Sequence, residues 1–485
     1  MNVVTSRERS SINLVRPEFP DRRTDQRAFL SLIDRVLRQA ESDEGLLSYH
    51  TDCKSELGRK QNGSYYTPID VAEFFWSQFF EGMGVRSSSE ALEFVRKYTL
   101  IEPSAGSGVL IFALLKKLSS MGVHPDALHS MDLRIIDING AALKYIESQV
   151  KMLNDALGAD VIRPLLEHVD FRRYKAEAVE RPIIFFGNPP FVASPRGSLW
   201  KNIYADFLHR CLSADHDTAA VHFIVPLSIS FSRDYVALRN SLREGRYSVW
   251  ASHFDNIPDT LFKSGKPQSE NTNKANSQRC TILSAFASNQ HSLYSTQLHR
   301  WSAAERSQML SSLPDFVDVT AYSLDQQFIR PASRKIAHYL QSGSYKYQLG
   351  DLTNKSGKYE LHIASVARNF IAVRDKPGSG INSFAFLNKD SFYKFLGLVT
   401  SDAFFVYWRS VGDGFHVTRS NVMGFPVSES LSDAVSVSIP KVRVLWRDRE
   451  KYQKAKINSG SLVLSYDFSC VALPLISKIG SHVFE

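Results

Sequence analysis

A short apolar run that ends in two consecutive prolines constrains the fold of this chain more than any other feature. Residues 183–187 are Ile-Ile-Phe-Phe-Gly, and Asn188-Pro189-Pro190-Phe191 follows directly. Such a run is typical of a buried strand. The prolines end it because they lack an N–H group and fix φ. We therefore expect Asn188 at the carboxyl end of a strand, where α/β sheets bind their ligands.

The tetrapeptide offers several contacts to a flat molecule that carries an NH2 group. The carboxamide of Asn188 and the carbonyl of Pro189 can accept hydrogen bonds from a planar amine, and Phe191 has a face on which a ring can stack. This combination suits an exocyclic amine whose nitrogen attacks an electrophile. The plainer interpretation is a strand-ending loop stiffened by proline, and a second motif upstream counts against it.

A strand, a glycine turn and a helix precede this motif. We predict a strand over 98–102 and a helix over 109–118, joined by Pro103-Ser104-Ala105-Gly106-Ser107-Gly108. This unit is typical of a nucleotide-binding doubly wound sheet. The turn has neither the Gly-x-Gly-x-x-Gly nor the Gly-Lys-Ser/Thr pattern. Glu102 at the strand end would repel phosphates and suits a ligand with an ammonium group, such as S-adenosylmethionine.

Two further predicted strands lead to carboxylates. Residues 133–137 end in Asp137, which is placed to accept ribose hydroxyls, and a helix over 141–153 follows. Residues 165–169 lead to Asp170-Phe171, an acceptor for an adenine amine beside a ring that could stack on the base. Either aspartate alone is more often a loop or capping residue. Their succession before Asn188 favours a shared site.

In this order, the motifs resemble those of S-adenosylmethionine-dependent N6-adenine DNA methyltransferases of the bacterial restriction–modification type. The resemblance is to the group with the cofactor motif before the catalytic motif and a C-terminal target-recognition domain. It covers about residues 64–287. The matching segments are Tyr66-Thr67-Pro68, the turn at 102–108, Asp137, Asp170-Phe171, 188–191, 202–207, 222–226, 259–262 and 278–282.

The resemblance implies a role for each matched residue. Thr67 and Glu102 would meet the carboxylate and the amine of the cofactor's methionine, and Asp137 its ribose. Asn188 and the Pro189 carbonyl would accept from the N6 amine of a flipped adenine. The expected site comprises Asn188, Pro189, Pro190 and Phe191 for catalysis; Tyr66, Thr67, Pro68, Glu102, Pro103, Ala105, Gly106, Gly108, Asp137, Asp170 and Phe171 for S-adenosylmethionine; and Phe262 and Tyr204 for the substrate, with no metal.

Composition is compatible with these expectations. The chain has 485 residues and 43% hydrophobic residues, which suits about two or three globular domains. A formal net charge of +8 permits binding to double-stranded DNA without requiring it. No apolar run approaches the ~18–20 residues of a membrane span, and residues 1–14 lack the apolar part of a secretory signal. The four cysteines have no metal-ligand spacing. We expect a cytoplasmic protein with free thiols.

The predicted fold class is α/β. We expect a doubly wound Rossmann-like methyltransferase sheet at 61–295, an N-terminal helical extension at 1–60 and a C-terminal α+β target-recognition domain at 296–485. In the extension, Phe29, Leu30, Ile33, Val36 and Leu37 fall on one helix face. In the C-terminal part, the aromatic stretch at 402–409 is more typical of core than of a base-contacting surface.

Other functions stay open. The same amine pocket would suit cytosine N4, the N2 of guanine in RNA or the side chain of a protein glutamine. A DNA-specificity or scaffold subunit with a vestigial catalytic domain is a second class, which the intact motif set disfavours. A fused nuclease has only a loose match in Asp21 with Asp52-Cys53-Lys54, within a stretch of helical character. Any restriction or defence partner is therefore expected to be a separate protein.

Overall fold

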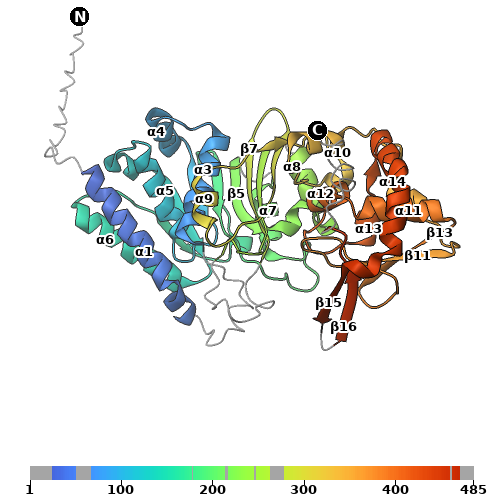
Figure 1. The fold of residues 1–485 in the computed structure, drawn as a ribbon. Coiled ribbons are helices and arrows are strands. Elements are labelled where there is room, and N and C mark those ends of the chain that lie inside the picture. Colours follow the sequence, from blue (N-terminus) through green and yellow to red (C-terminus); the bar gives the residue numbers. More distant parts are fainter. Residues whose placement is uncertain are drawn as a thin grey trace, which may run out of the picture.

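A nine-stranded sheet with helices on both faces occupies the first two thirds of the chain (Figure 1). The computed structural model describes residues 25–50, 67–176, 179–213, 217–244, 247–262, 278–458 and 461–469. The strands of the large sheet are β1 (Thr99–Glu102), β2 (Asp132–Asp137), β3 (Leu165–His168), β4 (Ile183–Gly187), β5 (Thr218–Pro226), β6 (Tyr247–Phe254), β7 (Cys280–Ala287), β8 (Ser292–His299) and β9 (Val317–Asp318).

The order of the strands is β3-β2-β1-β4-β5-β7-β6-β8-β9. The first five are mutually parallel, in the order 3-2-1-4-5 of doubly wound nucleotide-binding folds. Strand β7 runs antiparallel between β5 and β6, and β8 is parallel to β6. The carboxyl ends of β1, β2, β4, β6 and β8 therefore lie along one edge of the sheet.

The central strands are apolar because helices cover both of their faces. All residues of β1 and β4 are buried, as expected of parallel strands in such a sheet. Along β4, Ile184 and Phe186 pack with α1, α3, α5 and α6, whereas Phe185 packs with α7 and α8. The helices of this lobe are α1 (Gln26–His50), α3 (Ile69–Met83), α4 (Ser88–Lys97), α5 (Val109–Ser120), α6 (Gly140–Leu157), α7 (Ile203–Cys211), α8 (Val236–Glu244) and α9 (Arg306–Ser311).

The amphipathic helix expected near the N-terminus is α1. Its residues Phe29, Ile33, Val36 and Leu37 are buried, and Leu30 is half-buried. Helix α1 packs against α5 and α6, so it covers helices that flank β1 and β2. The predicted apolar face is confirmed, and it supports the sheet from outside.

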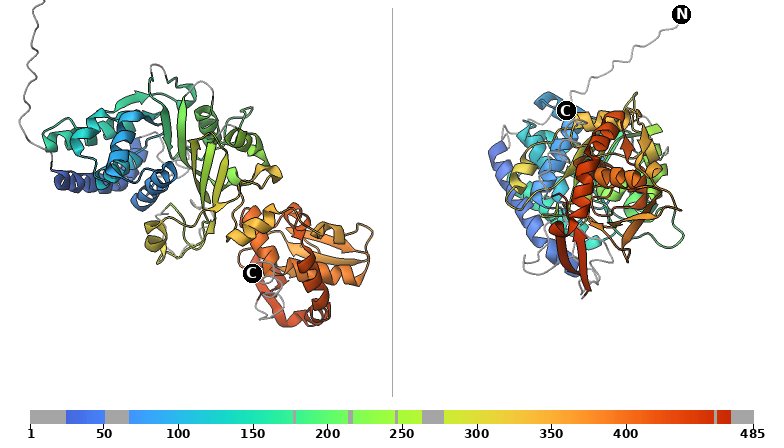
Figure 2. Two further views of the ribbon diagram at one scale, coloured as in Figure 1. Left: turned by 90° about the horizontal axis from the view of Figure 1, so that it is seen from above. Right: turned by 45° about the vertical axis from the view of Figure 1, so that its right-hand side comes forward.

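The C-terminal lobe has its own antiparallel sheet and lies beside the larger lobe (Figure 2). The strand order there is β13-β11-β12-β16-β15, and β10 pairs with β14. The elements are α10 (Arg334–Gln341), β10 (Tyr347–Gln348), β11 (Tyr359–Ala364), β12 (Val373–Arg374), β13 (Ile381–Phe386), α11 (Lys389–Val399), α12 (Asp402–Val411), α13 (Arg419–Met423), β14 (Pro426–Val427), α14 (Glu429–Arg447), β15 (Gln453–Asn458) and β16 (Ser461–Tyr466).

The aromatic stretch at 402–409 forms α12. Its residues Phe404, Tyr407 and Trp408 are buried, which confirms them as core. The α/β fold class, with a doubly wound sheet followed by a C-terminal α+β lobe, is also confirmed. Strands β8 and β9 extend the large sheet past residue 295. The boundaries of the three predicted domains stay predictions.

Within the described ranges, no helix is long and apolar enough to cross a bilayer. Cys211 and Cys280 are buried free thiols. Cys53 and Cys470 lie outside the described residues, as do Tyr66, Asp21 and the segment 52–54.

Candidate active site

Three of the predicted site residues meet at one edge of the sheet. Glu102 ends β1, Asp137 ends β2, and Asn188 follows β4 directly. In the sheet, β1 lies between β2 and β4, and all three run parallel. Neighbouring strands are about 4.8 Å apart. The fold therefore gathers residues that are up to 86 positions apart in the sequence (188 − 102).

Glu102 is a charged side chain that is almost completely buried at this edge. It is 1% exposed, and its Oε2 has no hydrogen-bond partner among the residues that the structure describes. Burial raises its pKa well above the ordinary value, and the nearby carboxylate of Asp137 raises it further. Burying such an oxygen without a partner is costly. A cationic donor at this position would relieve both the burial cost and the repulsion.

The glycine turn after β1 wraps around Asp137. The backbone N–H groups of Gly106 and Asn139 donate to its two carboxylate oxygens over 2.9 and 2.7 Å. Gly106 and Gly108 adopt φ of +54° and +79°, which favours glycine. A Cβ on Gly108 would also lie 3.1 Å from Ile146. A carboxylate has about four lone-pair positions, so Asp137 retains capacity for hydroxyl donors.

Asp170 and Phe171 are less open to a ligand than expected. The Arg172 guanidinium holds both oxygens of Asp170, with Nε 3.0 Å from Oδ1 and Nη2 2.6 Å from Oδ2. These hydrogen bonds lower the pKa of Asp170. Phe171 is 2% exposed, and its ring packs against Phe207 and Phe185 at centroid distances of 5.0 and 5.9 Å. Contacts of both residues with an adenine ring stay predictions.

Asn188 is held by a residue that lies just before helix α3. Its Nδ2 donates to Thr67 Oγ1 over 3.2 Å, and Ser104 Oγ donates to its backbone oxygen over 3.4 Å. Thr67 is 6% exposed and immediately precedes Pro68, the N-cap of α3. The bond turns the carboxamide nitrogen toward Thr67, so the amide oxygen lies on the other side of the carboxamide carbon. Ser104 was not among the expected site residues.

The aromatic residues of the site contact one another. The rings of Phe191 and Phe262 lie 6.0 Å apart at 65°, and Phe191 meets Tyr204 at 6.5 Å and 78°. A base stacked between two rings needs about 7–8 Å, because each stacking contact takes ~3.5–4.0 Å. The rings of Phe191 and Phe262, which would stack on the two faces of a base, thus meet edge to face with no base-sized gap between them. Tyr204 is fully buried, with its hydroxyl 3.1 Å from Ser228 Oγ.

An arginine that the sequence did not suggest connects two parts of the site. The Arg306 guanidinium on α9 binds Asp70 through Nε (2.6 Å) and Nη2 (3.0 Å). It also donates to the carbonyls of Thr260 and Leu261 over 2.7 and 2.8 Å. We name these four residues the Arg306 clamp. The Asp70 side chain is one third exposed, whereas that of Arg306 is 10% exposed.

The Arg306 clamp acts on two segments that carry predicted site residues. Asp70 lies in the first turn of α3, three positions after Thr67, and Leu261 directly precedes Phe262. The clamp therefore fixes the start of α3 relative to Phe262. No local signal could have revealed it, since Arg306 and Asp70 are 236 residues apart. Within the described ranges, no group of three metal-binding side chains occurs.

No protein-family model matches the chain, and no curated protein matches its sequence. Solved structures give partial matches. The DrdV–DNA complex shares 13% identity at a TM-score of 0.44, over 67% of this chain and 38% of that one. The type IIG restriction endonuclease BpuSI is 11% identical at a TM-score of 0.44, and the match covers 92% of this chain and 65% of that one. A type I restriction-modification methyltransferase subunit from Streptococcus thermophilus is 16% identical at a TM-score of 0.33, and the match covers 53% of this chain and 55% of that one. The chain thus spans less than two thirds of the first two proteins.

Proposed function

We propose that this protein is a site-specific DNA methyltransferase that transfers a methyl group from S-adenosylmethionine to the N6 amine of a flipped adenine in double-stranded DNA. Its setting would be restriction–modification or phage defence. One observation carries the proposal. Asn188, which can accept from a planar amine, and Glu102, a buried carboxylate suited to a cation, end neighbouring parallel strands.

The first part of the site fits the cofactor. The Oε2 of Glu102, which has no hydrogen-bond partner among the described residues, would accept from the ammonium of the methionine moiety. Asp137 would accept from ribose hydroxyls, and the turn at Gly106 lets the backbone approach the ligand closely. When bound there, S-adenosylmethionine supplies a methyl group on a positively charged sulfur. Thr67 would lie beside its carboxylate end and, through its hydroxyl, beside Asn188.

The second part of the site fits an extruded adenine. A base cannot be reached inside a duplex, so the enzyme flips it out at a cost of a few kcal/mol. Asn188 and the Pro189 carbonyl accept the two N–H groups of N6, which raises electron density on nitrogen and favours its attack on the methyl group. Phe191 stacks on the base, and Phe262 must withdraw from Phe191 before the base can enter. Tyr204, being fully buried, positions Phe191.

Transfer of tritiated methyl from S-adenosylmethionine tests this proposal. Purified protein is offered duplex DNA, RNA and protein in parallel, and labelled DNA is hydrolysed to identify the modified nucleoside. We expect label in DNA as N6-methyladenine and at least a 100-fold lower rate for Asn188→Ala. The matched control is Asn289→Ala, an exposed residue between β7 and β8 at the opposite edge of the sheet.

Each other outcome contradicts part of the proposal. Label in N4-methylcytosine, RNA or protein would change the substrate. Equal rates for Asn188→Ala and the wild type would remove Asn188 from the reaction. Absence of transfer to any acceptor would favour a DNA-specificity or scaffold role. Thermal-shift measurements with S-adenosylmethionine are the control, and we expect Asn188→Ala still to fold and to bind the cofactor.

A further inference from the structure

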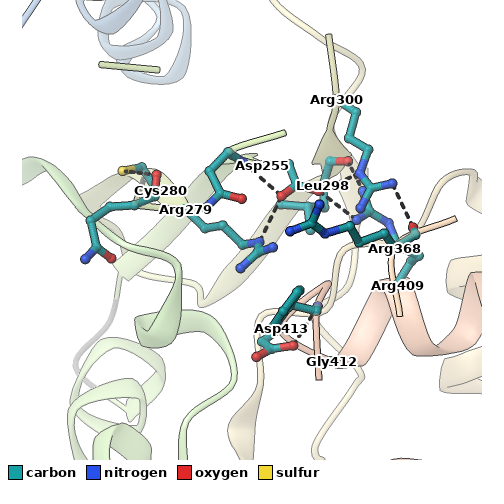
Figure 3. Close-up of polar contacts among 12 residues, drawn as sticks. Asp255, Arg279, Cys280, Leu298, Arg300, Arg368, Arg409, Gly412 and Asp413 are labelled. Carbon is teal, nitrogen blue, oxygen red and sulfur yellow. Dashed lines mark hydrogen bonds and ion pairs between the residues drawn. The ribbon is translucent and has the colours of Figure 1, made fainter. Parts of the chain in front are cut away.

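Three arginines bind one buried carboxylate where the large sheet meets the C-terminal lobe, and a fourth arginine lies beside them (Figure 3). Asp255, which follows β6, is fully buried. Its Oδ1 accepts from Arg279 Nε over 2.8 Å, and its Oδ2 accepts from Arg300 Nε over 2.6 Å and from Arg409 Nη1 over 2.8 Å. Arg300 also donates to the backbone oxygen of Arg368 over 2.9 Å. We name these five residues the Asp255 cluster.

The Asp255 cluster lies at the same sheet edge as the candidate active site. Asp255 follows β6, Arg300 follows β8, and Arg279 precedes the antiparallel β7. The intervening order is β4-β5-β7-β6-β8. At ~4.8 Å per strand, the cluster therefore begins about 10 Å from Asn188 and extends to about 20 Å along the edge. Arg409 comes from α12, so the C-terminal lobe contributes to it.

The cluster carries more positive charge than its carboxylate can balance. Arg279 and Arg368 both lie against the ring of Phe415, with guanidinium carbons 5.6 and 5.8 Å from its centroid. Among the described residues, neither the Nη atoms of Arg279 nor the guanidinium of Arg368 has a hydrogen-bond partner, and the Nη2 of Arg300 is buried without one. The guanidinium groups thus keep donors for a further acceptor.

Another carboxylate beside the cluster, that of Asp413, already has hydrogen-bond donors (Figure 3). Asp413 accepts from the backbone N–H groups of Phe415 and His416 and contacts the His416 ring. Burial lowers the pKa of Arg409. The positive charges of Arg300 and Arg279 also lower it, whereas the contact with Asp255 raises it. Gly414 lies close to the cluster, because a Cβ at this position would be 3.1 Å from Arg409 Nη1 and 3.8 Å from Arg279 Nε. The guanidinium groups are therefore held in place while remaining incompletely neutralised.

We infer that the Asp255 cluster binds backbone phosphates of the DNA duplex whose adenine enters the candidate active site. This inference rests on the proposed function. Guanidinium groups match phosphate oxygens with paired N–H donors, and phosphate contacts set the register of a protein on a duplex. Asp255 holds the arginines in place, and the cluster lies beside the base-binding edge on the side that the C-terminal lobe covers.

The salt dependence of DNA binding tests the inference. The affinity of the full-length protein for a duplex is measured between 50 and 300 mM KCl for the wild type and for Arg368→Gln. Arg368 is exposed and binds no carboxylate among the described residues, so its replacement should leave folding intact. The matched control is Arg163→Gln, also exposed, which precedes β3 at the opposite edge of the sheet.

We expect the slope of log affinity against log salt to become shallower by about 1 for Arg368→Gln, as for one lost phosphate contact. The same loss is expected for Arg279→Gln, whereas Arg163→Gln keeps the wild-type slope. If the wild type and both cluster variants bind the duplex with the same slope, the phosphate site is wrong and the proposed DNA substrate still stands. A wild type that binds an RNA hairpin but no duplex would overturn both this inference and the proposed DNA substrate.

Discussion

At the scale of single residues, the burial of Glu102 shows how a residue of the proposed cofactor site can oppose stability. Its carboxylate is 1% exposed, and burial raises its pKa well above 4.5. The folded protein therefore holds a proton that the unfolded chain releases. The stability that this group contributes is present at low pH and is lost as the pH rises from 4.5 through the folded-state pKa. Above the folded-state pKa, the ionised group lowers the stability of the ligand-free protein.

We predict that Glu102→Gln stabilises the ligand-free protein and weakens cofactor binding. At pH 7.5 the free energy of unfolding should rise by about 1–3 kcal/mol, because a neutral amide replaces a buried carboxyl group whose Oε2 has no hydrogen-bond partner among the described residues. S-adenosylmethionine should raise the melting temperature of the wild type and not that of the variant. Thermal denaturation with and without cofactor measures both effects.

The exposed Glu93 on α4 provides the control for this variant. Glu93→Gln removes one carboxylate from the surface, where its ion pair with Lys97 is 3.7 Å long and solvent-exposed. It should change neither the melting temperature nor the shift with cofactor. A Glu102→Gln protein that is less stable than the wild type and still binds S-adenosylmethionine normally would contradict the assigned role.

At the scale of elements, the Arg306 clamp joins α9, α3 and the segment before Phe262. We predict that Arg306→Lys, which keeps the charge and loses the paired donors, lowers stability by about 1–3 kcal/mol. Methyl transfer should fall by roughly 10- to 100-fold, because the aromatic wall shifts relative to Asn188. The fall should appear in kcat, measured well below the melting temperature.

A double-mutant cycle separates the clamp from a general loss of packing. Asp70→Asn alone should resemble Arg306→Lys, and the double variant should cost less than the sum, with a coupling energy of about 0.5–3 kcal/mol. Additive effects on the rate would show that Asp70 and Arg306 act independently. That outcome would reject the clamp as a positioning device.

The elements around the site were accessible from the sequence, whereas the contacts between them were not. The strands β1 and β4 appear as short apolar runs because both of their faces are covered, and the turn at Gly106 appears through its glycines. The insertion of β7 between β5 and β6 has no local signature. Likewise, the packing of Phe171 against Phe185 and Phe207 joins residues far apart in the sequence and has no local signal.

At the scale of the whole molecule, a buried polar network joins α3 to the centre of the sheet. His222 on β5 contacts the Phe75 carbonyl at 2.8 Å and Ser284 Oγ at 2.9 Å. Gln78 donates to Ser284 Oγ and accepts from Ser252 Oγ over 2.6 Å. Burial lowers the pKa of His222 to about 3. The folded protein therefore requires this imidazole to be neutral.

This network predicts acid sensitivity of the whole fold. Between pH 6.5 and about 3, the unfolded chain binds a proton at His222 that the folded protein excludes. Stability is complete above pH 6.5 and falls as the pH decreases, by about 1.4 kcal/mol per pH unit for this histidine. Chemical denaturation from pH 5 to 7.5 measures the slope. His222→Gln should flatten it by that amount, and an unaltered slope would contradict the assignment.

The sharpest test of the central claim is methylation-aware sequencing of DNA from cells that express the protein. We predict N6-methyladenine at one sequence motif in cells with the wild type, and none at that motif in cells with Asn188→Ala. Cells with Asn289→Ala should match the wild type. Adenine methylation that persists at the motif with Asn188→Ala, or its absence with the wild type, would contradict the assignment of Asn188 as the residue that binds the target amine.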